Sequence, residues 1–138
     1  MITADADLRV GNLMTLDPIT IASDELAMEA ERLIKSYRIS GLPVVDEGLV
    51  MGVLSQTDLL TARSSDLISG NWPRLRVRHL MSRPAMTVSA TSSVTSAARE
   101  MIEHHVHRLV VIDDAGAAIG VLTPLDLLRA LLDEADIA

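Results

Sequence analysis

The chain repeats itself, and this repeat constrains the fold more than any other feature of the sequence. The two copies match at an offset of 67 residues and, after one inserted residue, at 68. The matched stretches are 10–14 with 77–81, 20–21 with 87–88, 44–46 with 111–113, 52–55 with 120–123 and 58–60 with 126–128. One copy of about 55 residues would bury too little apolar surface to be stable alone. We therefore expect the two copies to fold together.

Each copy has the residue pattern of a β-α-β-β-α unit. Extended segments are expected near 19–21 and 86–88, each followed by an amphipathic helix with apolar residues at 3.6-residue spacing. The apolar positions are Leu26, Ala30, Leu33, Ile34 and Tyr37 in the first helix and Val94, Ala97, Ala98, Met101 and Ile102 in the second. Ser23 has the residue type and position of a helix cap.

A strand pair and a short final helix complete each copy. The strands are expected at 43–46 and 49–54, and again at 109–113 and 117–122, with the final helices beginning at Gln56 and Pro124. The chain then divides into an N-terminal extension (1–8), a first repeat (9–62), a linker (63–76), a second repeat (77–133) and a C-terminal tail (134–138). The linker is assigned from its Ser, Gly and Pro residues.

Composition excludes several classes of function. The absence of cysteine removes disulfides, thiol catalysis and thiolate metal sites. One Trp, one Tyr and no Phe argue against a stacking platform for single-stranded nucleic acid, and a net charge of −7 argues against duplex binding. No apolar run approaches the roughly 18 residues of a membrane span, and the acidic N-terminus does not resemble a signal peptide. We expect a soluble, cytoplasmic protein that binds neither nucleic acid nor membranes.

A Gly-Val-Leu-[Ser/Thr]-x-x-Asp-Leu-Leu motif ends each strand pair, at 52–60 and 120–128. It has two compatible interpretations. In the first, Ser55 with Asp58, and Thr123 with Asp126, are ordinary helix caps. In the second, the helix N-terminus and hydroxyl bind a phosphate while the carboxylate accepts hydrogen bonds from ribose hydroxyls. The motif by itself leaves both open.

Four motifs in the same order, twice, make the chain resemble a tandem cystathionine-β-synthase (CBS) domain pair over residues 9–132. The segments that carry the resemblance are Leu13-Met14-Thr15, Leu80-Met81-Ser82, residues 18–21, 39–46 and 106–113, and the two Gly-Val-Leu motifs. The resemblance implies an α/β (α+β) fold in which two β-α-β-β-α repeats pack as a pseudo-two-fold pair (a Bateman module). It also implies a stand-alone CBS-domain protein that forms a homodimer.

The resemblance further implies a regulatory module that binds AMP, ADP, ATP or S-adenosylmethionine in clefts between the repeats. Occupancy would pass to an unidentified protein effector through the conformation of the dimer, and no cofactor would be required. Carried over by position, the ligand-binding residues are Thr20, Gly41, Leu42, Ser55 and Asp58 in one set and Thr87, His107, Arg108, Leu109, Thr123 and Asp126 in the other. With so few aromatic residues, the base is expected to lie between aliphatic side chains such as Ile19, Leu42, Leu109 and Ile119 and to bind with micromolar affinity.

The copies differ where they would meet a phosphate. His107-Arg108 in the second copy replaces Ser40-Gly41, and Val110 replaces Pro43. Residues 1–70 carry a net charge of −6 and residues 71–138 carry −1. Both observations predict that an anionic ligand prefers the set that contains Arg108 and that the other set is weak or empty.

The remaining candidate residues favour simple structural roles. Adjacent His104 and His105 diverge on a helix, so we expect no metal site and place them at a helix end. Four arginines between 74 and 83 are expected to form a solvated edge, with phosphate contact or nucleic-acid contact as the alternatives. Trp72 is expected either to cover a groove at a dimer interface or to dock the linker. No catalytic constellation is present, so the chain is not expected to be an enzyme. The rival to a ligand sensor is a structural dimerisation module with vestigial clefts.

Overall fold

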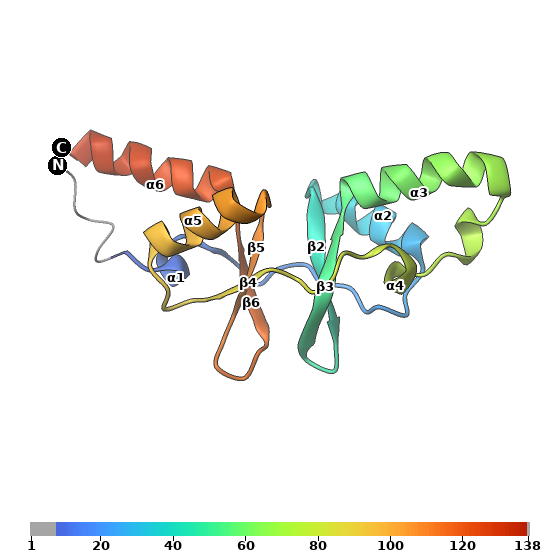
Figure 1. Cartoon of the computed structure of the whole chain (residues 1–138), viewed down its shortest axis with the longest axis horizontal. Helices are drawn as coiled ribbons and strands as arrows, with labels where there is room; N and C mark the ends of the chain where they lie inside the picture. The colour runs from blue at the N-terminus through green and yellow to red at the C-terminus, as the bar shows by residue number, and fades with distance from the viewer. Residues whose placement is uncertain (1–7, 138) are drawn as a thin grey trace. The chain divides into compact units, whose positions relative to one another are not determined.

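Figure 1 shows a computed structural model of the protein, which describes residues 8–137. Of the predicted N-terminal extension, residues 1–7 therefore lie outside the described residues. The elements are α1 (Val10–Leu13), β1 (Thr15–Leu16), α2 (Ala27–Tyr37), β2 (Gly41–Asp46), β3 (Leu49–Ser55), α3 (Gln56–Ser69), the 3₁₀ helix η2 (Trp72–Arg74), α4 (Val77–Leu80), β4 (Thr87–Ser89), α5 (Val94–His104), β5 (Leu109–Ile112), β6 (Ala118–Leu122) and α6 (Pro124–Ile137). This order confirms a mixed α/β fold built from two similar halves.

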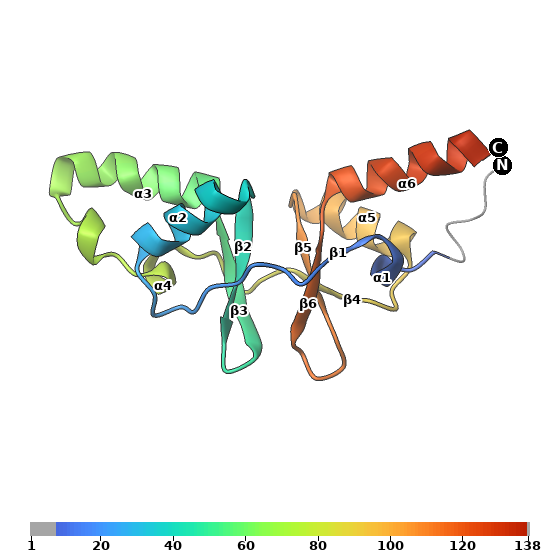
Figure 2. The ribbon, with the colours of Figure 1, turned by 180° about the vertical axis from the view of Figure 1, so that it is seen from behind.

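The chain forms two compact units that do not coincide with the two sequence repeats. Unit 1 combines Met1–Pro18 with Met86–Ala138, and unit 2 is Ile19–Ala85. The segment that opens the first repeat, with α1 and β1, thus belongs to the unit built on the second repeat. Figures 1 and 2 show α1 beside α5 from both sides. The segment with α4 belongs in the same way to the unit built on the first repeat.

Matched hydrogen bonds hold each opening segment in place. In unit 1 the N–H groups of Val10 and Gly11 donate to the carbonyls of Ser92 and Ala90, both at 2.9 Å. In unit 2 the N–H groups of Val77 and Arg78 donate to the carbonyls of Glu25 and Ser23, at 2.8 and 2.9 Å. Val10 and Val77 are fully buried. The same docking is therefore made twice, each time between segments distant in the sequence.

The strands of the two units are paired differently. Unit 1 has a four-stranded sheet of order β1-β6-β5-β4, in which only β4 and β5 are parallel. Unit 2 has the antiparallel pair β2-β3, beside which Ile21 forms a single parallel bridge to Val44. The strand predicted at 86–88 is confirmed as β4, one residue further on, whereas the strand predicted at 19–21 is reduced to this bridge. The difference has a local cause, because Val110 donates its N–H to Met86 at 3.0 Å and proline at the matched position 43 has no N–H to donate.

The helices correct several details of the prediction. Helix α2 begins at Ala27, so Ser23 lies outside it and does not cap it, and the cap position Leu26 makes no side-chain bond. The matched helix α5 is capped, since Ser93 Oγ accepts from the N–H of Ser96 at 3.1 Å. The apolar pattern was also wrong at two positions. Ile102 is 72% exposed and Tyr37 is 56% exposed, whereas the other predicted positions on these two helices are buried or half-buried.

The region predicted to be a linker is largely helical. Helix α3 continues to Ser69, so it is 14 residues long and not short, and α6 has the same length. Trp72, in η2, is 3% exposed and lies in the core of unit 2, where the guanidinium of Arg63 is 4.8 Å from its ring centroid. The expectation that Trp72 covers a dimer groove is therefore wrong. The alternative, in which it docks the connection between the repeats, is confirmed.

The glycine of each Gly-Val-Leu motif lies where an opening segment crosses the strand pair. A methyl group at Gly52 would be 2.5 Å from the carbonyl oxygen of Ser82, which pairs with Val53 on β3. A methyl group at Gly120 would be 2.5 Å from Met14 Sδ and 3.0 Å from the Thr15 carbonyl oxygen. A larger residue would displace backbone at Gly52 and the Met14 side chain at Gly120, so the repeated glycine is explained by the crossing segment.

We predict that Gly52→Ala destabilises the protein more than Gly120→Ala. At Gly52 the obstacle is backbone that is hydrogen-bonded to Val53, whereas the nearest obstacle at Gly120 is the flexible side chain of Met14. The expected cost of Gly52→Ala is about 1–3 kcal/mol in the free energy of unfolding, measured by urea denaturation. Equal costs for the two variants would contradict this explanation.

Candidate functional site

The predicted site residues of the first set all fall in unit 2, and two of them, Ser55 and Asp58, lie at the start of α3. Asp58 Oδ2 accepts from the N–H of Ser55 at 2.9 Å, and the N–H of Asp58 donates to Ser55 Oγ at 3.1 Å. This reciprocal pair is a capping box that joins the end of β3 to the helix. Gly41 pairs with Ser55 across the strands, and the N–H of Gln56 donates to the carbonyl of Ser40 at 2.8 Å. The structure thus brings Gly41, Ser55 and Asp58 together.

The second set falls in unit 1 and has the same geometry around the start of α6. Asp126 Oδ2 accepts from the N–H and the hydroxyl of Thr123, at 2.9 and 3.2 Å. The N–H of Asp126 is 3.4 Å from Thr123 Oγ1. Asp126 is 9% exposed, and it is the one charged residue that the structure buries among those it describes. The capping interpretation of the motif is therefore confirmed in both units, and every bond described to the two carboxylates uses Oδ2.

The predicted site residues at the start of β2 and β5 differ in how exposed they are to solvent. His107 is exposed and Arg108 is half-buried at the entry to β5. Leu42 and Leu109 are fully buried and belong to the cores of units 2 and 1. Neither residue exposes its side chain or its backbone, so the expectation that these two leucines sandwich the base is wrong. Ile19 and Ile119 are partly buried against the same cores.

The two predicted threonines are exposed, Thr20 beside β2 and Thr87 in β4 beside β5. Thr87 begins β4 and pairs with Val110 in the parallel ladder. Thr20 directly precedes Ile21, whose N–H donates to the Pro43 carbonyl at 3.2 Å and whose carbonyl accepts from Val45 at 2.9 Å. Each threonine therefore lies in the same unit as the hydroxyl–carboxylate pair with which it was grouped.

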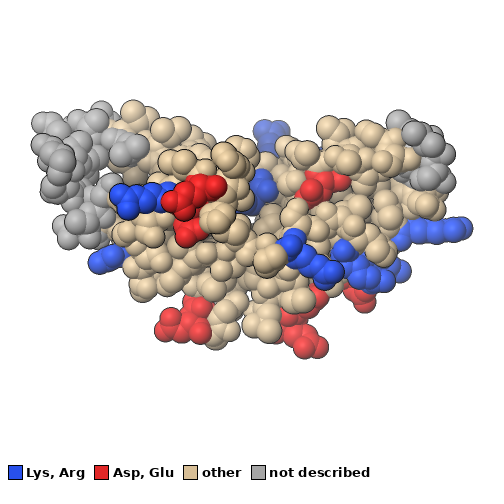
Figure 3. All heavy atoms as spheres, viewed as in Figure 1, with Lys and Arg blue, Asp and Glu red and all other residues tan. Residues whose placement is uncertain are grey.

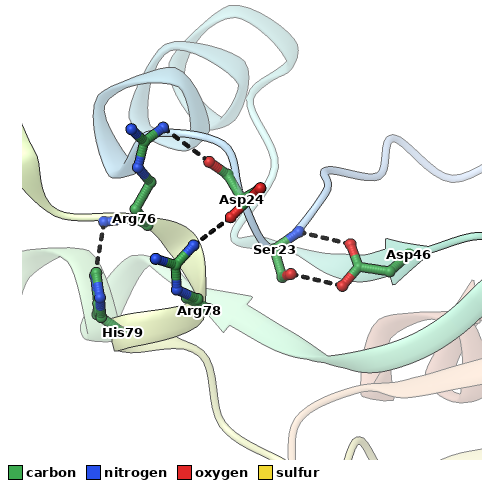
Figure 4. A network of polar contacts seen from close by, with 6 residues as sticks. All are labelled: Ser23, Asp24, Asp46, Arg76, Arg78 and His79. Carbon is green, nitrogen blue, oxygen red and sulfur yellow. Dashed lines mark hydrogen bonds and ion pairs between the residues drawn. The ribbon is translucent and has the colours of Figure 1, made fainter.

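Sequence reasoning missed a polar network in unit 2, which Figure 4 shows. Asp46 binds Ser23 through both carboxylate oxygens, Oδ1 to the N–H at 2.9 Å and Oδ2 to the hydroxyl at 2.5 Å. These bonds, first that of the hydroxyl and then that of the N–H, lower the pKa of Asp46 below its usual value. The available signal was that Asp46 matches Asp113 in the repeat, whereas Ser23 matches Ala90. Asp113 instead accepts from the N–H groups of Ala115 and Ala117 in its own turn.

The arginines at 76 and 78 take part in the same network. Arg76 Nη1 donates to the carbonyl of Asp24 at 3.0 Å, and Arg78 is paired with the Asp24 carboxylate. On the face shown in Figure 3, Lys and Arg side chains gather near α4 with acidic atoms directly beside them. These two arginines thus join α4 to the loop before α2, a role that the sequence did not indicate.

The net charges of the folded units differ from those of the two halves of the sequence. Unit 2 contains eight basic and eight acidic residues, a net charge of zero, whereas unit 1 contains four basic and eleven acidic residues and carries −7. The unit with Arg108 is therefore the more acidic one. The prediction that it binds an anion better now depends on the local pair His107-Arg108 alone.

The histidines at 104 and 105 lie at a helix end, as predicted. Helix α5 ends at His104, and His105 adopts a left-handed conformation with φ of 53°. His104 Nε2 is 3.3 Å from Glu100 on the same helix. The described residues contain no group of three potential metal ligands, and none of the described helices is long and apolar enough to cross a membrane.

Comparison with known proteins adds to this geometry. A family model for the CBS domain matches residues 10–65 and 77–133. The inosine-5′-monophosphate dehydrogenase of Korarchaeum cryptofilum is 27% identical over 90% of this chain, but the chain spans only 24% of that enzyme's length. The match to the dehydrogenase therefore carries no catalytic activity to this chain.

Solved structures of CBS proteins have a similar fold along nearly the whole of this chain. The protein CBSX2, which is known from Arabidopsis thaliana, was crystallised in complex with AMP. In that complex it is 29% identical, with a TM-score of 0.80 over 91% of this chain and 96% of its own. The CBS domain pair of protein MJ0100, in complex with 5′-methylthioadenosine and S-adenosyl-L-methionine, is 25% identical, with a TM-score of 0.79 over 90% and 99%.

We predict that Asp46 makes the stability of the protein fall at low pH. Because the folded pKa is lowered, the contribution is fully present above the unfolded value of about 4 and is lost as pH falls through the folded value. The free energy of unfolding of the wild type and Asp46→Asn should therefore differ at pH 7 and converge below the lowered pKa, as measured by urea denaturation at each pH. In a Ser23→Ala background the pH dependence due to Asp46 should shrink. A difference that stays constant with pH would contradict this origin.

Proposed function

Because this chain belongs to the CBS-domain family and contains two CBS domains, we propose that it is a regulatory module that binds an adenosine-containing ligand. The observation that carries the proposal is the hydroxyl–carboxylate pair at the start of both α3 and α6, in a chain similar along most of its length to a CBS protein crystallised with AMP. The candidate ligands are AMP, ADP, ATP and S-adenosylmethionine.

The capping bonds and ligand binding are compatible because they use different oxygens. The bonds described to Asp58 and Asp126 engage Oδ2. The other carboxylate oxygen, Oδ1, is the proposed acceptor for the ribose hydroxyls. The cap then fixes the orientation of the carboxylate before a ligand arrives, which lowers the entropy cost of binding.

The proposed phosphate contacts come from Thr123, His107 and Arg108 in unit 1 and from Ser55 in unit 2. An arginine beside a phosphate supplies charge-assisted hydrogen bonds, which are about twice as strong as neutral ones. The net charge of unit 1 opposes anion binding, but exposed charges more than about 8 Å away are screened at physiological salt. We therefore propose that an anionic ligand binds more tightly to the set with Arg108 than to the set in unit 2.

Regulation follows if the ligand binds one conformation of the protein better than another. A ligand at 100 times its Kd stabilises the binding-competent state by about 2.7 kcal/mol. That free energy is available to shift a conformational or dimer equilibrium, which an effector protein would recognise. The proposed assembly is a homodimer.

A structural dimerisation module is the alternative, and one observation favours it for unit 2. Ser40-Gly41 supplies no cation at the positions where unit 1 has His107-Arg108. The cap also gives the Ser55 hydroxyl oxygen and Asp58 Oδ2 a structural role without a ligand. Unit 2 thus has a structural reason for its motif even if it binds nothing.

We predict that isothermal titration of the purified protein with AMP, ADP, ATP and S-adenosylmethionine detects micromolar binding of at least one ligand. Binding should also raise the melting temperature, since the ligand binds the folded state. NAD serves as a comparison ligand with a second nucleoside. No heat and no melting shift at millimolar concentrations of all the ligands would leave the dimerisation module as the function.

Matched variants locate the tighter site. Asp126→Ala and Arg108→Ala should each weaken binding by about tenfold or more, because each removes a charged hydrogen-bonding partner worth about 1.5–3 kcal/mol. Asp58→Ala is the matched control, with the same lost cap in the other unit, and should change this affinity little. Full affinity in both unit 1 variants would contradict the site assignment without affecting the fold.

A further inference from the structure

The segment that carries Thr20 is held against β2 by fewer ladder hydrogen bonds than its counterpart in unit 1. In unit 1, β4 pairs with β5 at three successive positions, and Val110 donates to Met86 at 3.0 Å. In unit 2 the matched donor is absent because residue 43 is proline. Only Ile21 is bridged there, through its bonds with Pro43 and Val45.

Unit 2 has a second restraint that unit 1 lacks. Two residues beyond Ile21, Ser23 makes two bonds to the carboxylate of Asp46, which ends β2. Figure 4 shows the two dashed contacts between the loop before α2 and the end of the strand. In unit 1 the residue matched to Ser23 is Ala90, which has no hydroxyl, and Asp113 bonds to its own turn. Pro43 and the Ser23–Asp46 pair, which we call the clamp, thus occur together in unit 2, and unit 1 has neither.

We propose that the Ser23–Asp46 pair is a positioning device that takes the place of the ladder bond lost at Pro43 and so holds Thr20 at the ligand site of unit 2. Hydrogen bonds to an ionised carboxylate are stronger than neutral ones, so two of them can offset one missing amide bond. The clamp acts through the backbone of residues 20–23 and touches no ligand itself. The part of the inference that concerns ligand binding rests on the proposed function.

Hydrogen exchange of two matched amides tests the clamp without any ligand. The N–H of Val45, bonded to Ile21, reports on unit 2, and the N–H of Val110, bonded to Met86, reports on unit 1. Ser23→Ala, which copies Ala90, should speed exchange at Val45 by about tenfold and leave Val110 unchanged. Ser23→Thr keeps the hydroxyl and should retain protection at Val45. Equal acceleration at both amides, or none at Val45, would overturn the proposal.

A rescue experiment separates replacement of the ladder bond from a general structural role. Pro43→Val introduces the residue found at position 110 and restores the N–H donor. In the Ser23→Ala background it should return Val45 exchange to near the wild-type rate. If it does not, the clamp does not substitute for the missing bond and the proposal fails. Asp113→Asn is the matched control in unit 1 and should not change exchange at Val110.

Titration with AMP tests the link to binding. AMP-induced shifts of the Thr20 and Thr87 amides, followed by NMR, report on units 2 and 1 separately. Ser23→Ala should weaken the response at Thr20 by at least about threefold and leave that at Thr87 unchanged, and Pro43→Val should restore it. An unchanged response at Thr20, or a wild-type response at Thr87 alone, would overturn the positioning role. If wild-type protein responds to no nucleotide at either amide, the proposed function fails, and the exchange experiment still decides whether the clamp holds the segment.

Discussion

The crossing of each opening segment over a strand pair is the contact on which the rest of the structure depends. Met14 and Thr15 cross β6 at Gly120, and Met81 and Ser82 cross β3 at Gly52. These crossings pass close to the two glycines, bury Val10 and Val77, and bring together segments far apart in the sequence. Each unit is therefore completed by a segment that belongs, in sequence order, to the other repeat. The chain therefore passes from one unit to the other twice, after Pro18 and after Ala85.

The two candidate sites have the same capping bonds but different polar residues around them. The capping boxes at α3 and α6 are alike in their partners and nearly alike in their distances. The residues around them differ, with a cationic pair in unit 1 and a serine–carboxylate clamp in unit 2. The same capping geometry thus stands in two different polar surroundings, one with a cationic pair and one with a serine–carboxylate pair.

Much of the fold was predictable because its signals are local. The period of the apolar residues predicted α2 and α5, and the turn residues between apolar runs predicted the pairs β2-β3 and β5-β6. The two helix caps were also predicted from the sequence, since the Ser55–Asp58 and Thr123–Asp126 spacing is typical of a cap where a helix follows a strand. The predictions that were wrong involve contacts between residues far apart in the sequence. Ser23 fits a cap equally well by type and position, but the carboxylate of Asp46, 23 residues away, binds it instead.

The sequence by itself determined the repeat, the order of elements and the residues at each helix start, because these depend on neighbours within a few positions. Only the tertiary structure decided which segments complete each unit, since a crossing at Gly52 or Gly120 joins residues from opposite repeats. Because of this regrouping, the unit that contains Arg108 carries the acidic excess, whereas the half of the sequence that contains Arg108 is nearly neutral. It also placed Trp72 in a core and Leu42 and Leu109 out of reach of a ligand, because burial depends on contacts that residue type does not specify.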